Sequence, residues 1–180
     1  MYPLVRLVRS TLFARFRSQL TPHQCSEFSF RVRPWDIDMF LELNNGRLLT
    51  LFDLGRFDLA TRVGLARELK ANKWGLVVAG STVRYRKRIR MFNKVTIRTQ
   101  LIAVDERWFY LQQTALAGGV ACASALLRTA VTKAGRLHPV AEVASKIKVD
   151  LERFTPELWC QKWIDLEELR EWPPRDRAVE

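Results

Sequence analysis

The sequence predicts an α+β domain in which one antiparallel sheet of five strands wraps around a single long helix. Residues 24–34 alternate between apolar and polar side chains, which is typical of a half-buried strand. Apolar residues with helical spacing follow over 44–63. From Gly75 the alternation returns and continues to about residue 132, interrupted only by short breaks. One sheet that curls around one helix would bury both apolar surfaces.

Length and composition indicate one globular domain with anionic partners. The chain has 180 residues, a net charge of +11 and 48% hydrophobic residues. A chain this basic is expected to bind an anionic partner, such as nucleic acid, anionic lipid or a phosphorylated molecule such as coenzyme A. Its three cysteines form no C-x-x-C pair, so we expect free thiols in a reducing compartment, the cytoplasm. Two distant histidines argue against zinc, and we expect no metal and no cofactor.

Residues 1–20 are expected to form a basic amphipathic helix. It would precede a main domain over 21–135 and a helical extension over 136–180. The helix either lies on an anionic membrane or packs on protein, and we favour packing on its own domain or on a partner subunit. No apolar run is long enough to cross a bilayer, and arginines interrupt any secretion signal. The apolar stripe recurs every four residues, at Leu4, Val8, Leu12, Phe16 and Leu20.

Capping and turn-forming residues predict where the remaining helices and strands begin and end. Pro34 ends the first strand, and Asn44 or Asn45 can cap the long helix, which Gly64 is expected to end. The strands after it are joined by breaks short enough for hairpins, so a four-strand meander is predicted. We expect the tail over 173–180 to be disordered. Further helices are expected at 65–72, from 138–139 to about 148, and from 156 to about 172. Further strands are expected at 76–90, 94–104, 107–117 and 119–132.

The loop over 35–43 carries the residues that could perform chemistry. Free backbone N–H groups at the start of the long helix have a partial positive charge. An ester or thioester carbonyl docked there would have its developing negative charge stabilised. Asp38 could then act as the nucleophile or as a general base for water. A simpler interpretation is that Asp36 and Asp38 only balance nearby arginines.

This loop resembles the motifs of a known family. The run D-I-D-M-F-L-E-L-N-N-G-R-L, followed by D-L-G-R, is similar to D-x-D-x-x-x-H-x-N-N-x-x-Y and E-x-A-R of hotdog-fold acyl-CoA thioesterases. These belong to the 4-hydroxybenzoyl-CoA thioesterase-like group, and W-F-Y-L at 108–111 resembles its THEM6-like subgroup. The resemblance covers residues 25–133. It implies the hotdog fold, metal-independent hydrolysis of an acyl-CoA or acyl-carrier-protein thioester, and dimers or tetramers with sites at subunit interfaces.

The resemblance also assigns roles to individual residues. Asp38 falls on the catalytic carboxylate, and Asn44 and Asn45 fall on the asparagine pair at the helix start. The N–H groups near Gly46 are expected to hold the thioester carbonyl. Glu42 stands where many relatives have histidine, and a second carboxylate near Asp38 would raise one pKa of the pair. The site is then either a working acid–base pair or one that binds acyl-CoA or acyl-carrier protein without hydrolysis.

Four arginines form a second candidate site. Arg84, Arg86, Arg88 and Arg90 alternate through the expected strand over 76–90 and would share one face. Guanidinium groups suit the pyrophosphate and 3′-phosphate of coenzyme A, although a solvated face is an equal interpretation. Nucleic acid is not expected, because no exposed aromatic residues are interleaved on that face.

Overall fold

The computed structural model describes residues 4–174, except for the side chains of residues 4, 5 and 9–11. One antiparallel sheet has the strand order β1-β3-β4-β5-β2, and a short β6 pairs with β5. The strands are β1 (Ser26–Arg31), β2 (Gly75–Tyr85), β3 (Lys94–Val104), β4 (Phe109–Ala117), β5 (Val120–Lys133) and β6 (Arg136–Leu137). The helices are α1 (Leu4–Phe16), α2 (Asn45–Arg62), α3 (Leu65–Asn72), α4 (Val140–Ile147) and α5 (Leu158–Leu169), with 3-10 turns η1 (Pro34–Asp36) and η2 (Leu151–Phe154).

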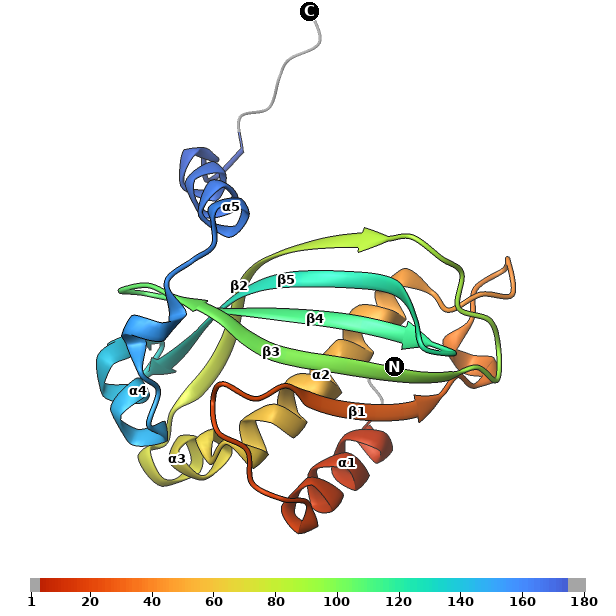
Figure 1. Cartoon of the computed structure of the whole chain (residues 1–180), viewed down its shortest axis with the longest axis horizontal. Helices are drawn as coiled ribbons and strands as arrows, with labels where there is room; N and C mark the ends of the chain where they lie inside the picture. The colour runs from red at the N-terminus through yellow and green to blue at the C-terminus, as the bar shows by residue number, and fades with distance from the viewer. Residues whose placement is uncertain (1–3, 175–180) are drawn as a thin grey trace, which may run out of the picture.

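The sheet curls around α2, which is the predicted hotdog fold (Figure 1). Leu51 and Phe52 of α2 are completely buried in the main core, together with Ile97 of β3. Gly55 allows helix and sheet to approach closely, because a Cβ there would lie 2.8 Å from both Ile97 Cγ2 and Thr99 Oγ1. Packing against β3 therefore explains a glycine in the middle of this helix.

The predicted meander is wrong, because β2 pairs with β5 and not with β3. β2 ends at Tyr85, five residues earlier than expected, and residues 86–93 lead to the opposite edge. There Phe92 N–H donates to Val32 O at 3.0 Å, and Val32 N–H donates to Asn93 O at 3.0 Å. Alternation identifies the buried face of a strand but not its neighbour. β1 and β2 are consequently the two edges of the main sheet.

The N-terminal helix packs on its own domain, but through a face that was not predicted. α1 lies against α2, with Ala14 only 2% exposed. Val8, Leu12 and Phe16 are 58%, 50% and 88% exposed, so these three residues of the expected stripe face outward, while Leu20 lies beyond the helix and is half-buried. Arg6 sets this rotation, because its Nη2 lies 2.8 Å from the buried Asp36 carboxylate. Residues 1–3 of the expected helix lie outside the described residues.

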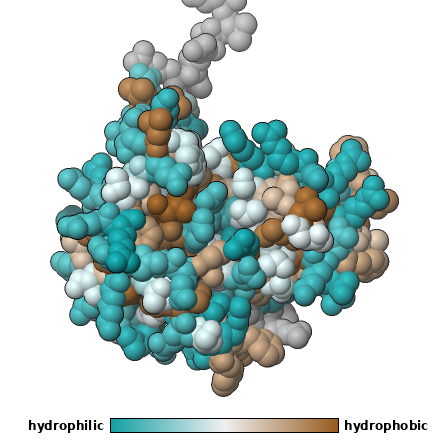
Figure 2. All heavy atoms as spheres, viewed as in Figure 1, coloured by the Kyte–Doolittle hydropathy of each residue, from teal (hydrophilic) through white to brown (hydrophobic). Residues whose placement is uncertain are grey.

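The C-terminal extension contributes helices to two different places. Val140 and Val143 of α4 pack with Phe109 and Val131 at one end of the sheet. α5 lies on the sheet face opposite α2, and apolar side chains are visible directly beneath it (Figure 2). The predicted helices are thus present, while the tail expected over 173–180 lies mostly outside the described residues. None of the described helices has the length and apolar character needed to cross a membrane.

Candidate functional site

The start of α2 is built by Asn44. Its Oδ1 accepts a hydrogen bond from Arg47 N–H at 3.0 Å, and its backbone oxygen accepts from Leu48 N–H at 2.8 Å. Asn44 is therefore the N-cap, as one of the two predicted alternatives stated. The first N–H groups of a helix have no partner within it. Those of Asn45 and Gly46 remain available at the positive end of the helix dipole.

The acidic loop is folded into a tight turn in front of this helix. Asp38 N–H donates to Glu42 O at 2.9 Å, and Leu41 N–H donates to Asp38 O at 3.1 Å. The Asp38 carboxylate accepts from Phe40 N–H through Oδ1 at 2.9 Å. This bond fixes the orientation of the carboxylate and leaves Oδ2 without a hydrogen bond among residues 4–174.

A cavity of about 450 Å³ brings most of the predicted site together. Its walls come from the acidic loop, the first turn of α2 and residues 85–89 after β2 (the right-hand end of Figure 1). The residues that line this cavity are Asp38, Phe40, Glu42, Leu43, Asn45, Leu48, Tyr85, Arg86, Lys87, Arg88, Ile89 and Ala123. Gly46 and Asn44 do not line this cavity. Gly46 can contribute its backbone N–H group to the site, and Asn44 contributes by capping the helix.

Glu42 has a partner of opposite charge inside this cavity. Its Oε2 lies 3.4 Å from Arg88 Nε, and its backbone bridges to Arg90. Arg86 and Lys87 form no ion pair among the described residues, so the cavity keeps two cations for an anionic ligand. Tyr85 and Lys87 were missed in the sequence because the strand was expected to continue through them. Burial raises the pKa of the Tyr85 hydroxyl above its ordinary value.

The prediction that four arginines share one face of a strand is wrong. The N–H groups of Arg86 and Lys87 both donate to Cys122 O, at 2.8 and 3.0 Å, and the chain leaves the ladder there. Arg86 and Arg88 consequently reach the cavity that contains Asp38. Arg84 is still within β2 and lines a different groove, on the other face of the sheet.

Asp36 has the structural role that the simpler interpretation gave to both loop aspartates. It is 1% exposed, and its two carboxylate oxygens lie 2.8 Å from Arg6 Nη2 and 3.4 Å from Arg47 Nε. Its backbone oxygen accepts from Asn44 N–H at 3.0 Å. Asp36 therefore holds α1 and the start of α2 in place.

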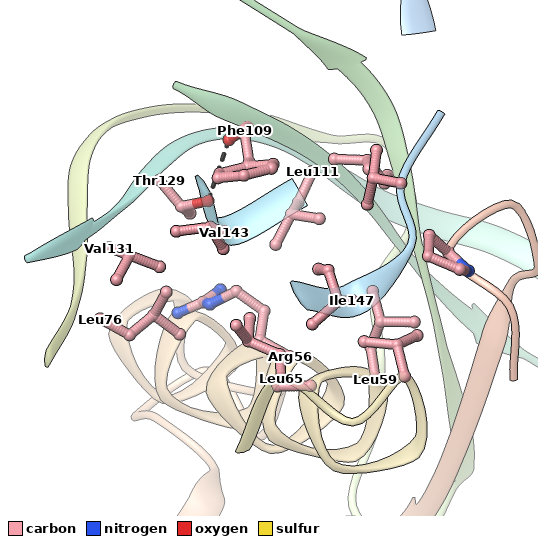
Figure 3. A pocket seen from close by; sticks show the side chains of 15 residues that line it. Arg56, Leu59, Leu65, Leu76, Phe109, Leu111, Thr129, Val131, Val143 and Ile147 are labelled. Carbon is pink, nitrogen blue, oxygen red and sulfur yellow. Dashed lines mark hydrogen bonds between the residues drawn. The ribbon is translucent and has the colours of Figure 1, made fainter. Parts of the chain in front are cut away.

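A second, smaller cavity lies at the other end of α2, where α4 closes the space between helix and sheet (Figure 3). Its volume is about 60 Å³, and its walls are almost entirely apolar. Arg56 lies on the wall, but its guanidinium is used by Gln113 Oε1 at 2.7 Å and by Asp53.

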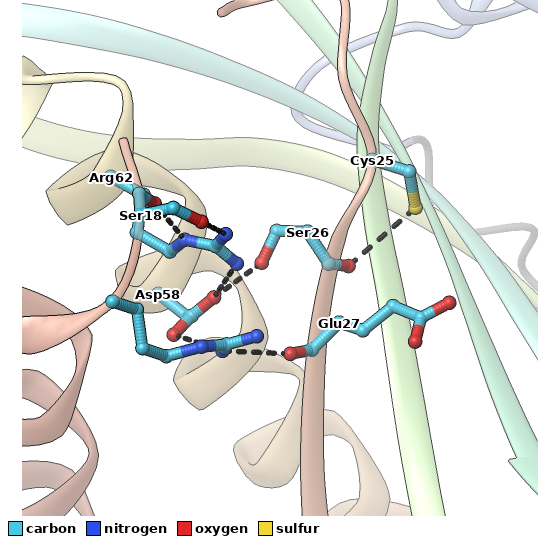
Figure 4. Close-up of polar contacts among 7 residues, drawn as sticks. Ser18, Cys25, Ser26, Glu27, Asp58 and Arg62 are labelled. Atoms are coloured by element: carbon cyan, nitrogen blue, oxygen red, sulfur yellow. Dashed lines mark hydrogen bonds and ion pairs between the residues drawn. The ribbon is translucent and has the colours of Figure 1, made fainter. Parts of the chain in front are cut away.

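A second buried carboxylate, Asp58, ties the N-terminal segment to the domain (Figure 4). Its Oδ1 accepts from Arg17 at 2.9 Å, while Oδ2 accepts from Ser26 Oγ at 2.5 Å and from Arg62 at 3.5 Å. Arg62 also donates to Ser18 O at 2.9 Å. Both oxygens are occupied, which leaves Asp58 a structural group.

The profile of the thioesterase-like superfamily matches residues 32–158. The chain belongs to the thioesterase-like superfamily. Within this superfamily it is 34% identical over 136 residues to protein THEM6 of Danio rerio, an alignment that covers 74% of this chain. It spans 66% of that relative's length, and 42% of the length of protein THEM6 of Xenopus laevis.

Solved structures of other proteins share the fold. YbaW, a probable thioesterase from Escherichia coli, has a TM-score of 0.64 at 20% identity, covering 70% of this chain and 98% of YbaW. A Thermus thermophilus thioesterase that was crystallised with coenzyme A and Zn has a TM-score of 0.60, also at 20% identity. That alignment covers 68% of this chain and 90% of the Thermus protein. Among residues 4–174 of this chain, no three His, Cys, Asp or Glu side chains cluster closely enough to hold a metal ion.

Proposed function

We propose that this chain hydrolyses an acyl-CoA thioester to coenzyme A and a free acid, without a metal ion. The observation that carries the proposal is the position of Asp38, which shares a 450 Å³ cavity with Asn45 at the start of α2. Membership of the thioesterase-like superfamily supports this reaction, and so do coenzyme A in the Thermus structure and the name thioesterase given to YbaW.

The thioester carbonyl oxygen would accept hydrogen bonds from the N–H groups of Asn45 and Gly46. Negative charge that develops on this oxygen is stabilised by those donors and by the helix dipole. Asp38 takes a proton from a water molecule that attacks the carbonyl carbon, or attacks that carbon directly. When water attacks, the C–S bond breaks and the coenzyme A thiolate receives the proton that Asp38 took. When Asp38 attacks directly, breaking the C–S bond leaves a mixed anhydride on Asp38, and a water molecule then hydrolyses it to the free acid and supplies the proton for the thiolate. Asn44 positions the donors by capping the helix.

Arg86 and Lys87 would hold the pyrophosphate of coenzyme A at the mouth of the cavity. Both line the cavity and form no ion pair in the described part of the chain. Arg88 is already engaged with Glu42, and its contribution to binding is therefore smaller. Arg90 follows the cavity segment, where its backbone bridges to Glu42.

A non-catalytic binder of acyl-CoA or acyl-carrier protein is the second candidate. Glu42 favours it, because a carboxylate paired with Arg88 replaces the histidine of many relatives. An assay of thiol release from a panel of acyl-CoA substrates, combined with calorimetry, separates the two functions. Tight binding of acyl-CoA by the unmodified chain without any turnover would establish the binder.

The substitution Asp38→Asn tests the catalytic role directly. It keeps the size of the side chain and the bond from Phe40 N–H, but it removes the base or nucleophile. We expect kcat to fall by about 100-fold or more, with little change in binding. Asp165→Asn on exposed α5 is the matched control and should leave kcat unchanged. Equal activity of Asp38→Asn and the unmodified chain would exclude Asp38 as base and nucleophile.

We also propose a homodimer, or a tetramer made from two dimers, joined through the edge strand β2. Val77 and Val78 in β2 are 38% and 48% exposed, and the backbone groups of an edge strand are free to pair with a second copy. Sedimentation equilibrium measures the mass directly. A mass that stays at the 21.0 kDa of one chain at all concentrations would exclude this assembly.

Peripheral contact with an anionic membrane, from a cytoplasmic location, is proposed for α1. The outward stripe of Val8, Leu12 and Phe16 favours it, together with the net charge of +11. Co-sedimentation with anionic and neutral vesicles tests the contact, with Leu12→Ser/Phe16→Ser as the variant. Failure of the unmodified chain to bind anionic vesicles at low salt would end this idea.

A further inference from the structure

A groove of about 390 Å³ lies on the face of the sheet opposite Asp38, between the strands and α5. This face, partly covered by α5, is the one seen in Figure 2. The groove combines one guanidinium group, several uncharged polar side chains and two indole rings. Its lining residues are Thr82, Arg84, Gln112, Ser124, Ala125, Leu126, Trp159 and Trp163.

The two indole rings are held in fixed positions. Trp159 and Trp163 are one helical turn apart on α5, so they are neighbours on its surface. Trp159 Nε1 donates to Glu157 Oε2 at 2.8 Å. The ring of Trp163 packs edge-on against the buried ring of Tyr110, with centroids 6.2 Å apart and an interplanar angle of 90°. Trp159 remains 47% exposed, so it can still contact a ligand.

The polar wall of the groove offers donors and one positive charge. Arg84 forms no ion pair with any described residue, and Ser124 is its register partner on β5. Gln112 Oε1 accepts from Gln100 Nε2 at 3.1 Å, and the Gln112 amide N–H groups have no acceptor within the described part of the chain. Arg84 is the only lining residue with a formal charge. The groove therefore suits an anion that has a flat apolar part.

We propose that this groove binds a phosphorylated purine nucleoside. A purine base can stack on an indole face, a contact that does not depend on the identity of the base. The Arg84 guanidinium is a suitable partner for phosphate, and Ser124, Thr82 and Gln112 can bond to ribose hydroxyls. The volume of the groove falls within the range of small-molecule sites, about 300–1,000 Å³.

The nucleotide can come from two sources. It is either a free nucleotide or the nucleotide half of coenzyme A, and the second source rests on the proposed function. Tyr85 lines the Asp38 cavity while the preceding residue, Arg84, lines the groove. Because β2 ends at Tyr85, a long ligand could pass around the end of this strand from one site to the other.

Calorimetric titration of the full chain with ADP and with adenosine 3′,5′-diphosphate tests the groove itself. We expect one site per chain, weakened at least tenfold by Arg84→Gln and by Trp159→Leu. Arg136→Gln and Trp172→Leu, also exposed but outside the groove, are the matched controls and should change affinity less than twofold. Circular dichroism checks that every variant is folded. The proposal is overturned if neither nucleotide binds at millimolar concentration, or if the controls weaken binding as much as the groove variants.

Steady-state kinetics then distinguishes the two sources. If the groove holds the nucleotide half of coenzyme A, Arg84→Gln raises KM for acyl-CoA but not for the matching acyl-pantetheine, which lacks the nucleotide. If it holds a free nucleotide, both KM values stay unchanged while ADP binding is still lost. A chain without hydrolytic activity would refute the proposed function, yet it would leave the calorimetric result intact.

Discussion

Asn44 is the single residue on which the geometry of the candidate site most depends. It caps α2 through Arg47 N–H at 3.0 Å, so it determines where the free N–H groups of Asn45 and Gly46 point. Asn44→Ala should lower the free energy of unfolding by about 1 kcal/mol. Because the oxyanion donors lose their support, kcat should fall more than binding does.

Asn44→Ser is the matched control, since serine is also a good N-cap. It should restore most of the stability and most of kcat. Urea unfolding and thiol release from acyl-CoA measure the two effects. If Asn44→Ala lost stability while keeping full activity, the cap would be structural only.

Residues of the site that are close in sequence could be predicted, whereas those that depend on distant contacts could not. Asp38 and the asparagine pair are separated by only a few residues, and local spacing brings them together. Arg84 and Arg86 lie in different sites because the N–H groups of Arg86 and Lys87 both donate to Cys122 O. Cys122 is 36 residues after Arg86 in the sequence. No alternation rule contains that contact. Likewise, nothing local indicates that Glu42 pairs with Arg88.

At the scale of elements, α4 is tightly fitted except at the apolar cavity in Figure 3. Val143 is completely buried and lines this cavity of about 60 Å³. Val143→Ile adds one methylene group and should raise the free energy of unfolding by about 0.5–1 kcal/mol. Val143→Ala enlarges the cavity and should lower it by about 2 kcal/mol. Urea unfolding measures both, and a destabilised Val143→Ile would show that the space is already filled.

The individual elements could largely be predicted from the sequence, but their pairing could not. The periodicity predicted α2 over 44–63, and the helix spans Asn45–Arg62. It also predicted β3, which has the expected bounds, Lys94–Val104. Residues 91–93 resemble a hairpin turn, although they belong to a connection between opposite edges of the sheet. The strand order depends on how the whole sheet curls around α2. This curling involves all five strands together, so no single segment of the sequence indicates it.

At the scale of the whole molecule, edge strand β2 separates two sites of different character. The Asp38 cavity lies on the side of α2, and the Arg84 groove lies on the side of α5. The C-terminal extension therefore contributes one wall of a ligand site as well as covering the sheet. The sequence indicated the helix but not its position, because the stripe on α5 does not identify the surface it contacts.

The packing of α5 also predicts how the stability of the whole chain depends on pH. Burial raises the pKa of the Cys160 thiol. Burial is also the main reason that the pKa of the Tyr110 hydroxyl is raised, and its hydrogen bond to Asp105 raises this pKa further. In the unfolded chain these groups ionise at about 9.0 and 10.0. A raised folded-state pKa favours folding fully below the unfolded value, and this contribution is lost as pH rises above it. The free energy of unfolding should therefore fall above pH 9.

Cys160→Ala isolates the first part of this fall. Because the substitution also creates a cavity, the comparison uses the slope of stability against pH and not the absolute value. Urea unfolding between pH 7 and 10 should show a shallower decline for Cys160→Ala than for the unmodified chain. Cys25→Ala, which alters a half-buried thiol far from α5, is the matched control and should keep the full slope. Identical slopes for all three proteins would mean that the Cys160 thiolate is tolerated in the folded state, and that α5 opens locally before the domain unfolds.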